Sequence, residues 1–233
     1  MSGIRQRAVG AAMILLMTAA TLTAQDAGRL TYSEQVFDFG HVAIEFRIFR
    51  TYSLVNETDK EIRITSVDAS CDCSAVGLSD STVAPGDTVY FYLDFNTRDA
   101  YGPVTRSFTV FLDNAPRPEF KFYYVSDIGV WLKGIKPDPV SVFFLPGRTE
   151  QEVVIANPLY QKLSVQLTEQ ASDFFDVDIT KDVAKRGENL RIKVYPQADL
   201  KPGTHYSSFT LSVSGEGLQK PVPLTIPVKI VKY

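Results

Sequence analysis

The sequence has few of the residues on which most catalytic and metal sites depend. Its 233 residues include two cysteines, two histidines and one tryptophan. His41 and His205 both stand beside turns, and neither has a serine or cysteine partner at the spacing of a known catalytic motif. Neither a Gly-x-Ser-x-Gly sequence nor a glycine-rich phosphate loop occurs. We therefore expect a protein that is not an enzyme and that needs no cofactor.

Basic blocks and long apolar runs are also missing. The 24 Lys and Arg residues are spread along the chain among 27 Asp and Glu, for a formal net charge of −3. Binding to nucleic acid or to an anionic membrane surface therefore has no electrostatic support. The one apolar stretch, residues 8–20, is too short to span a bilayer core of about 30 Å. We expect no nucleic-acid partner and no integral membrane segment.

That apolar stretch has the features of an export signal. Arg5 and Arg7 precede it, and small residues follow it up to Ala24, a suitable cleavage position before Gln25. This order of basic, apolar and small residues predicts a secretory signal peptide over residues 1–24. We expect the protein to be exported, to the periplasm, the cell surface or the extracellular space, where the two cysteines meet an oxidising environment.

The most informative feature that is present is an internal repeat with an offset of 101 residues. Asn56 falls on Asn157, Gly86 on Gly187 and Gly102 on Gly203, and the sequence Ser-Phe-Thr recurs at residues 107–109 and 208–210. Alternating runs rich in Val, Ile, Phe and Tyr, separated by turn-forming residues, predict strands in both copies and no long helix. We expect an all-β protein with two tandem immunoglobulin-like antiparallel sandwiches, over residues 30–132 and 140–233, joined by a proline-containing linker at 133–139.

The repeat also separates the core of each domain from its surface. Positions that are apolar in both copies belong to the inner face: Val89/Leu190, Phe91/Ile192, Leu93/Val194, Phe108/Phe209, Val110/Leu211 and Leu112/Val213. The intervening positions differ, since the first copy has aromatic residues where the second has Arg191, Lys193 and Ser212. These aromatics, with two others of the first copy, are the candidate protein-binding residues: Tyr90, Tyr92, Tyr101, Phe111 and Tyr123. The alternative is that they pack on the second domain or on one another.

The first copy also has a cysteine pair, Cys71 and Cys73, which falls on Ser172 and Phe174. In a fully extended strand their Cα atoms would be about 6.6 Å apart, near the upper limit of about 6.8 Å for a disulfide, so a disulfide requires a bend at Asp72. Three interpretations remain open. The pair is a structural disulfide, a redox-active or inter-chain thiol pair, or two ligands for a soft metal such as Cu(I) with His41 or Asp72 nearby.

The first copy resembles a family of exported bacterial proteins, DUF1573, whose members look like immunoglobulin-type modules of the ASH, major-sperm-protein and PapD kind. The resemblance covers about 95 residues and depends on these segments: Phe37 to Val42, Tyr52 to Asn56, Ile62 to Ile64 with Val67, Ser70 to Ser74, Val83 to Asp87, and Phe95 to Thr97 with Gly102. In the family the cysteine segment usually reads Ser-Cys-Gly-Cys-Thr, so Asp72 replaces a glycine. The resemblance implies a fold and a compartment and supplies no activity.

Together these features predict a non-enzymatic binding or scaffolding protein of the cell envelope. Contact with an envelope or surface protein would use the aromatic sheet face of the first domain or an exposed edge strand. The second domain would serve as a spacer or support. The alternative is a thiol-redox or copper-binding periplasmic protein that uses Cys71 and Cys73. The identity of the partner and the oligomeric state do not follow from the sequence.

Overall fold

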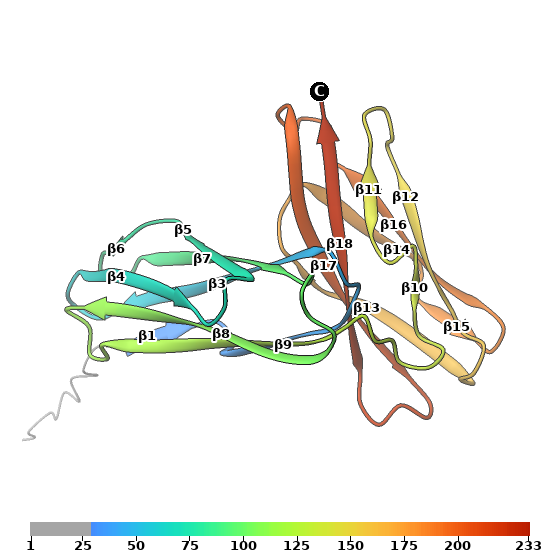
Figure 1. The fold of residues 1–233 in the computed structure, drawn as a ribbon, viewed down its shortest axis with the longest axis horizontal. Coiled ribbons are helices and arrows are strands. Elements are labelled where there is room, and N and C mark those ends of the chain that lie inside the picture. The colour runs from blue at the N-terminus through green and yellow to red at the C-terminus, as the bar shows by residue number, and fades with distance from the viewer. Residues whose placement is uncertain (1–28) are drawn as a thin grey trace, which may run out of the picture.

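The fold consists of β-strands joined by turns and loops, in a computed structural model that describes residues 29–233 (Figure 1). The predicted signal peptide, residues 1–24, lies outside the described residues. Residues 29–233 form no helix, and so none that could cross a membrane. The expected all-β architecture of immunoglobulin-like sandwiches is confirmed.

The first domain is a sandwich of two sheets that share one apolar core. One sheet, which we call the tyrosine sheet, has the order β1 (Arg29–Tyr32), β3 (Arg47–Glu57), β7 (Thr88–Asn96) and β5 (Ser74–Leu78). The other has the order β2 (Val36–Val42), β9 (Glu119–Ile128), β8 (Gly102–Asp113), β4 (Ile62–Ala69) and β6 (Thr82–Val83). All pairs are antiparallel except β2 with β9, which is parallel.

The second domain repeats this plan. Its first sheet has the order β10 (Pro137–Asp138), β12 (Gln151–Ala156), β16 (Asn189–Pro196) and β14 (Phe175–Lys181). Its second contains β15 (Val183–Lys185), β13 (Lys162–Gln170), β17 (Gly203–Gly215), β18 (Val222–Lys232) and β11 (Val142–Phe144). The pairing of β11 with β18 is parallel, like that of β2 with β9. The segment expected to be a linker, 133–139, includes β10, which pairs with β12.

Residues that the two copies share make matching hydrogen bonds in the two domains. The Asn56 amide group donates to the carbonyls of Lys60 and Val83, both at 2.8 Å, and the Asn157 amide group donates to those of Tyr160 and Ala184 at 2.9 and 3.0 Å. Each asparagine is fully buried. The backbone carbonyl of each asparagine accepts a bond of 2.7 Å from the amide of a turn glycine, Gly86 before β7 or Gly187 before β16, at φ of +84° or +85°. The shared residues therefore hold the same turn in both domains.

The predicted core positions are buried in both copies. All twelve residues of the six aligned pairs belong to the cores, and the least buried, Leu112, is 7% exposed. The two cores are separate clusters. Each domain therefore has its own apolar core, as a repeat of about 100 residues allows.

The two domains are nevertheless joined through their sheets. Strand β18 pairs with β2 at Leu224 and Gly40, so the second sheet of each domain becomes part of one ten-stranded sheet. Figure 1 shows β18 crossing the end of the first domain, with the strands of the two sandwiches running in different directions. Gly40 has φ of +62°, and a Cβ on it would lie 1.9 Å from the carbonyl oxygen of Pro223. This close contact of two backbones requires glycine.

Hydroxyl groups of the second domain complete the joint. The Thr225 hydroxyl donates to the carbonyl of Phe39 at 2.6 Å. The Ser208 hydroxyl accepts from the amide of Phe49 at 2.9 Å and donates to its carbonyl at 3.1 Å. Thr225 and Ser208 are both buried. Because these bonds satisfy backbone groups that the contact hides from water, they fix the relative position of the domains.

An ion pair lies beside these bonds. Arg50 of β3 is 8% exposed, and its guanidinium is 3.0 Å from the Glu169 carboxylate of β13 and 3.6 Å from the ring centre of Phe37. Burial raises the pKa of Glu169, and the nearby Arg50 offsets only part of this effect. The pair therefore orients the domains more than it stabilises them.

We predict that Gly40→Ala destabilises the protein and separates the unfolding of its domains. The left-handed backbone alone costs about 1–2 kcal/mol for a residue with a Cβ, and the clash with Pro223 adds to this. The control is Gly86→Ala, because Gly86 also has positive φ but has open space around its Cβ position. Calorimetry should show a lower first transition for Gly40→Ala than for Gly86→Ala. Equal transitions would contradict the assigned role of the contact.

We also predict a pH dependence that arises from Glu169. A carboxyl group whose pKa is raised in the folded state contributes stability below its ordinary pKa, and this contribution is lost as the pH rises through the folded pKa. The unfolding free energy of the wild type minus that of Glu169→Gln should therefore fall between pH 4 and pH 7. Urea unfolding at several pH values measures the difference, and an increase with pH would show that Arg50 outweighs burial.

Candidate protein-binding surface

The tyrosine sheet presents two aromatic side chains to solvent. Tyr90 and Tyr92 are two residues apart on β7, so both point away from the core, where Val89, Phe91 and Leu93 are buried. Tyr90 is 43% exposed and Tyr92 is 49% exposed. The structure therefore places these two predicted residues side by side on an outer face.

The neighbours of the tyrosines are small and uncharged. Across the ladders, Tyr90 lies opposite Ser53, and Tyr92 lies opposite Thr51 on one side and Gly77 on the other. A Cβ on Gly77 would lie 3.8 Å from the Tyr92 ring. The outward positions from Phe49 to Val55 on β3, from Thr88 to Tyr92 on β7 and from Ala75 to Ser79 at β5 carry no charge. An uncharged surface with rigid aromatic side chains is typical of the centre of a protein interface.

This face ends at an ion pair and a groove. Arg47 and Asp94 form an ion pair at the end of β3 and β7. A groove of about 320 Å³ starts at Tyr92 and runs between the domains. Phe49 lines it from the first domain, and Phe174 and Tyr206 line it from the second. The aromatic surface therefore continues from the tyrosine sheet into the groove.

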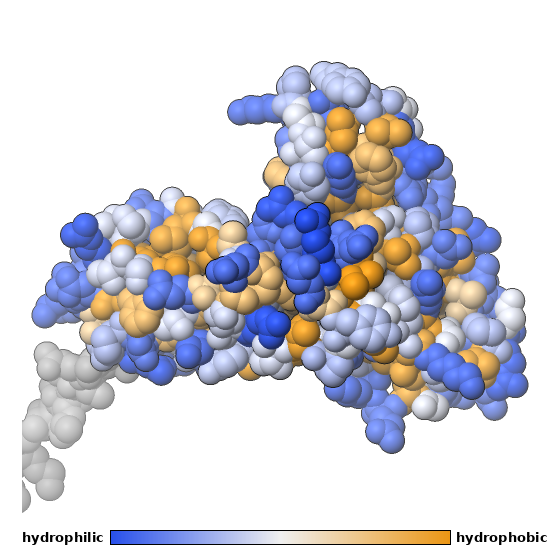
Figure 2. Space-filling model, viewed as in Figure 1, coloured by the Kyte–Doolittle hydropathy of each residue, from blue (hydrophilic) through white to orange (hydrophobic). Residues whose placement is uncertain are grey.

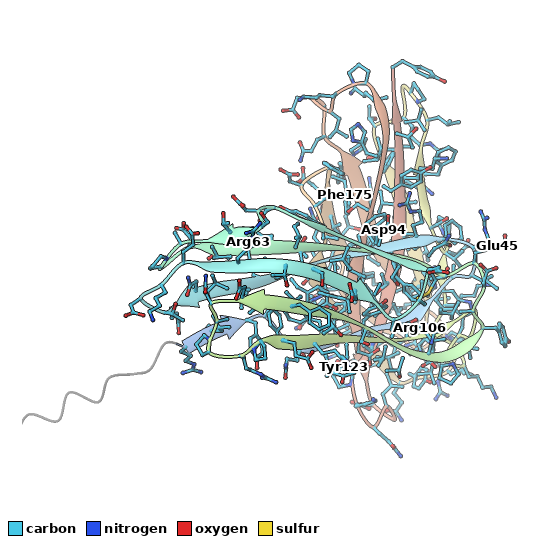
Figure 3. All side chains as sticks on the ribbon, turned by 60° about the vertical axis from the view of Figure 1, so that its left-hand side comes forward. Glu45, Arg63, Asp94, Arg106, Tyr123 and Phe175 are labelled. Atoms are coloured by element: carbon cyan, nitrogen blue, oxygen red, sulfur yellow. A yellow bond between two sulfur atoms is a disulfide. The ribbon has the colours of Figure 1, made fainter. Side chains whose placement is uncertain are left out.

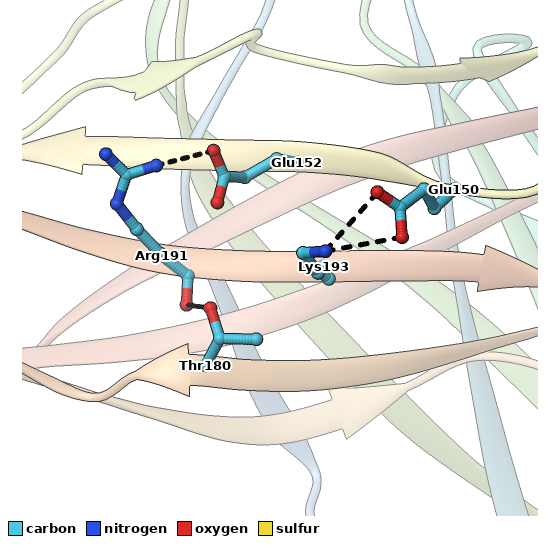
Figure 4. Close-up of polar contacts among 5 residues, drawn as sticks. All are labelled: Glu150, Glu152, Thr180, Arg191 and Lys193. Carbon is cyan, nitrogen blue, oxygen red and sulfur yellow. Dashed lines mark hydrogen bonds and ion pairs between the residues drawn. The ribbon is translucent and has the colours of Figure 1, made fainter.

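The same face of the second domain is charged (Figure 4). Arg191, which replaces Tyr90, is 2.7 Å from Glu152, and Lys193, which replaces Tyr92, is 3.3 Å from Glu150. The hydrogen bond to Glu150 raises the pKa of Lys193. Exposed ion pairs of this kind suit a solvated surface. Of the two corresponding faces, the uncharged aromatic one therefore belongs to the first domain.

The other predicted aromatic residues lie elsewhere. Phe111 on β8 and Tyr123 on β9 point outward from the opposite sheet, with Thr109 and Lys121 between them. Figure 3 shows Tyr123 on the opposite side of the first sandwich from Asp94. Tyr101, 74% exposed, precedes β8 in a loop and covers Gly129. The five predicted residues therefore occupy three separate surfaces, and only Tyr90 and Tyr92 are neighbours.

The two cysteines form a disulfide, and their Cα atoms are 5.2 Å apart. The expected bend is present, and Asp72 makes it without positive φ, so a glycine is not needed there. The Ser74 hydroxyl is 2.5 Å from the Tyr124 hydroxyl and 3.5 Å from the Cys71 sulfur. Burial raises the pKa of Tyr124. Both cysteine residues are only partly buried, and Cys73 lines a shallow cavity of about 270 Å³.

His41 has a different environment. It lies on β2, where its Nδ1 atom is 2.8 Å from the carbonyl of Val130 and 3.9 Å from the Asp127 carboxylate. Within residues 29–233 no three His, Cys, Asp or Glu side chains are grouped so that they could hold a metal ion. Because the disulfide joins both sulfurs, copper binding by this pair would require its reduction.

The groove includes residues that the sequence did not indicate. Phe174 occupies the repeat position of Cys73, and it faces the first domain instead of closing a disulfide loop. Tyr206 is 39% exposed, and the Arg47 guanidinium lies 5.1 Å from its ring centre. A repeat relates the two domains only by sequence position, so it carries no information about contacts between them. The exposed aromatic character of Tyr206 and Phe174 was the only available signal.

Three solved structures give a measure of the likeness to known folds. The VesB protease of Vibrio cholerae matches at 15% identity over 42% of this chain and 31% of its own, with a TM-score of 0.37. The ASH/PapD-like domain of human CEP192 matches at 9% identity over 51% of this chain and 97% of its own, with a TM-score of 0.34. The YadV chaperone matches at 10% identity over 85% of this chain and 98% of its own, with a TM-score of 0.31. All three TM-scores are below 0.5. This chain spans about a third of the length of VesB.

The sequence comparison identifies the first domain. No curated protein matches the chain. The family described as "Protein of unknown function (DUF1573)" matches residues 30–123, which contain the tyrosine sheet, the disulfide and the strand that joins the domains. Residues 30–123 of this chain therefore belong to the DUF1573 family.

Proposed function

We propose that the protein is a non-enzymatic, exported binding or scaffolding module that holds a protein partner against its tyrosine sheet. The observation that carries the proposal is the uncharged outer face around Tyr90 and Tyr92, which contrasts with the ion-paired face of the second domain. The sheet face carries exposed tyrosines in the first repeat, and the corresponding face carries exposed ion pairs in the second.

The shape of this region supports a protein partner. The face is a flat sheet that continues into the groove of about 320 Å³ at Tyr92. Tyrosine side chains supply a large contact area at low cost in side-chain entropy, and their hydroxyls remain available for hydrogen bonds at the rim. The joint supports the role as well, because a fixed angle between the domains keeps Phe174 and Tyr206 next to Tyr92.

The proposed place of action is the cell envelope or the outside of the cell. Support comes from the signal-peptide pattern of residues 1–24 and from the disulfide, since structural disulfides persist in oxidising compartments. The partner would then be another envelope or surface protein.

A second candidate function is thiol–disulfide exchange, favoured by the partial exposure of the disulfide at the cavity beside Cys73. In this reaction a partner dithiol would pass two electrons and two protons to the Cys71–Cys73 disulfide. The partner would become a disulfide, and both cysteines would become thiols. The small ring closed by the disulfide also fits a structural role, because it holds the bend that leads into β5.

We predict that Tyr90→Arg with Tyr92→Lys, which copies the second domain, reduces recovery of a cross-linked envelope partner at least tenfold. Both side chains are about half exposed, so the melting temperature should change little. The control is Tyr123→Lys, on the opposite sheet. Quantitative mass spectrometry after cross-linking in intact cells measures recovery. Equal recovery from the double variant and the wild type would rule out this surface.

For the cysteines we predict a structural role. A closed loop of three residues contributes at most about 1.6 kcal/mol on the chain-entropy model. Cys71→Ser with Cys73→Ser should therefore lose no more than this amount in urea unfolding and should keep partner recovery. Alkylation of cells followed by mass spectrometry should find the pair oxidised. A substantial reduced or mixed-disulfide fraction would support the second candidate function instead.

A further inference from the structure

Strand β5 is an edge of the tyrosine sheet with backbone groups that point away from the domain. Cys73 accepts from the amide of Asn96, and Ser79 donates to the carbonyl of Tyr90, which sets the alternation along the strand. Residues 75 and 77 therefore bond to β7, while the N–H and C=O groups of Val76 and Leu78 point outward. Neither residue has another backbone partner among residues 29–233.

Edge strands usually carry features that prevent pairing with another chain, such as charged side chains or bulges. The repeat supplies a direct comparison, because β14 occupies the position of β5 in the second domain. Strand β14 carries Asp176 and Asp178 on its outward face and a bulge between Ile179 and Lys181. At the positions of the two aspartates, β5 has Ala75 and Gly77. The charges that would prevent pairing are therefore present on this edge strand in the second domain and missing from it in the first.

We propose that β5 pairs with β5 of a second copy of this chain in an antiparallel, two-fold symmetric arrangement. Val76 of each copy would exchange hydrogen bonds with Leu78 of the other, so that every outward N–H meets an outward C=O. The two Gly77 residues would face each other at the symmetry axis, where Cα atoms of a non-hydrogen-bonded pair are about 4.5 Å apart. Val76 and Leu78 would also form apolar cross-strand pairs.

The comparison with β14 favours a second copy as the occupant. The same arrangement of β14 would place Asp178 opposite Asp178 at that short distance, and like charges directly opposite each other are destabilising. Glycine in β5 places neither charge nor bulk at the axis. Figure 2 shows apolar residues at the upper rim of the first domain, where β5 runs in Figure 1.

The pairing would extend the tyrosine sheet from four strands to eight across the two copies. Tyr90 and Tyr92 of both copies would then lie on one continuous face, because Tyr92 is separated from the edge only by Gly77. The pairing is independent of the proposed function. A protein that stays monomeric can still bind a partner through Tyr90 and Tyr92.

The test is the oligomeric state of the protein purified after removal of residues 1–24. Sedimentation equilibrium of the wild type should show a mass that rises with concentration toward twice that of the monomer. Gly77→Asp should remain monomeric, and the space around Gly77 accepts a Cβ, since the nearest atom is 3.8 Å away. Ser53→Asp, which adds the same charge to the same face in a central strand, should still form the dimer.

A second variant keeps the test decisive if Gly77→Asp does not fold. Leu78→Pro removes an outward N–H and the leucine side chain that would pair with Val76 of the other copy, and proline is tolerated at such positions of edge strands. It should also be monomeric with an unchanged circular dichroism spectrum. A wild type that is monomeric at all concentrations overturns the proposal, even if another molecule occupies β5. A dimer that persists in both Gly77→Asp and Leu78→Pro overturns it too, because another surface then forms the dimer.

Discussion

The contact between Gly40 and Pro223 is the constraint on which the rest of the structure depends. With any larger residue at position 40, β18 could not approach β2 closely enough for the two sheets to join. The hydroxyls of Thr225 and Ser208 then satisfy the backbone groups that this approach buries. The Arg50–Glu169 pair adds orientation at a cost in desolvation. The groove beside Tyr92 exists only because these contacts hold the second domain in place.

The two repeats differ on their surfaces and agree in their cores. Both keep a buried asparagine and a glycine turn at the same positions, which fixes the same sandwich twice. The outward face of the first sheet is aromatic and uncharged in one domain and ion-paired in the other. The edge of that sheet differs in the same sense, with Gly77 in place of Asp178. The uncharged face and the uncharged edge therefore belong to the same sheet of the first domain, and they are the observations behind the two proposed contacts.

Much of this could be predicted from the sequence, because strand alternation and the repeat are local signals. The six core pairs, the two sandwiches and the outward tyrosines of β7 follow from the side-chain period taken together with the repeat. The location of Phe111, Tyr123 and Tyr101 on other surfaces could not be predicted, because a period of two does not show which sheet a strand joins. The joint was not foreseen either. The segment from Phe37 to Val42 indicated the family, but its role in holding Pro223 depends on contacts with residues about 180 positions away. The second domain, expected to be a spacer or support, also lines the groove.

The central claim is that the two domains form one rigid body, and the relative orientation of the domains in solution tests it most directly. Residual dipolar couplings of backbone amides can be measured separately for residues 29–128 and 137–232 in one alignment medium. The account predicts that a single alignment tensor fits both sets in the arrangement of Figure 1. Two tensors of different magnitude or direction would show that the domains move independently, and would contradict it.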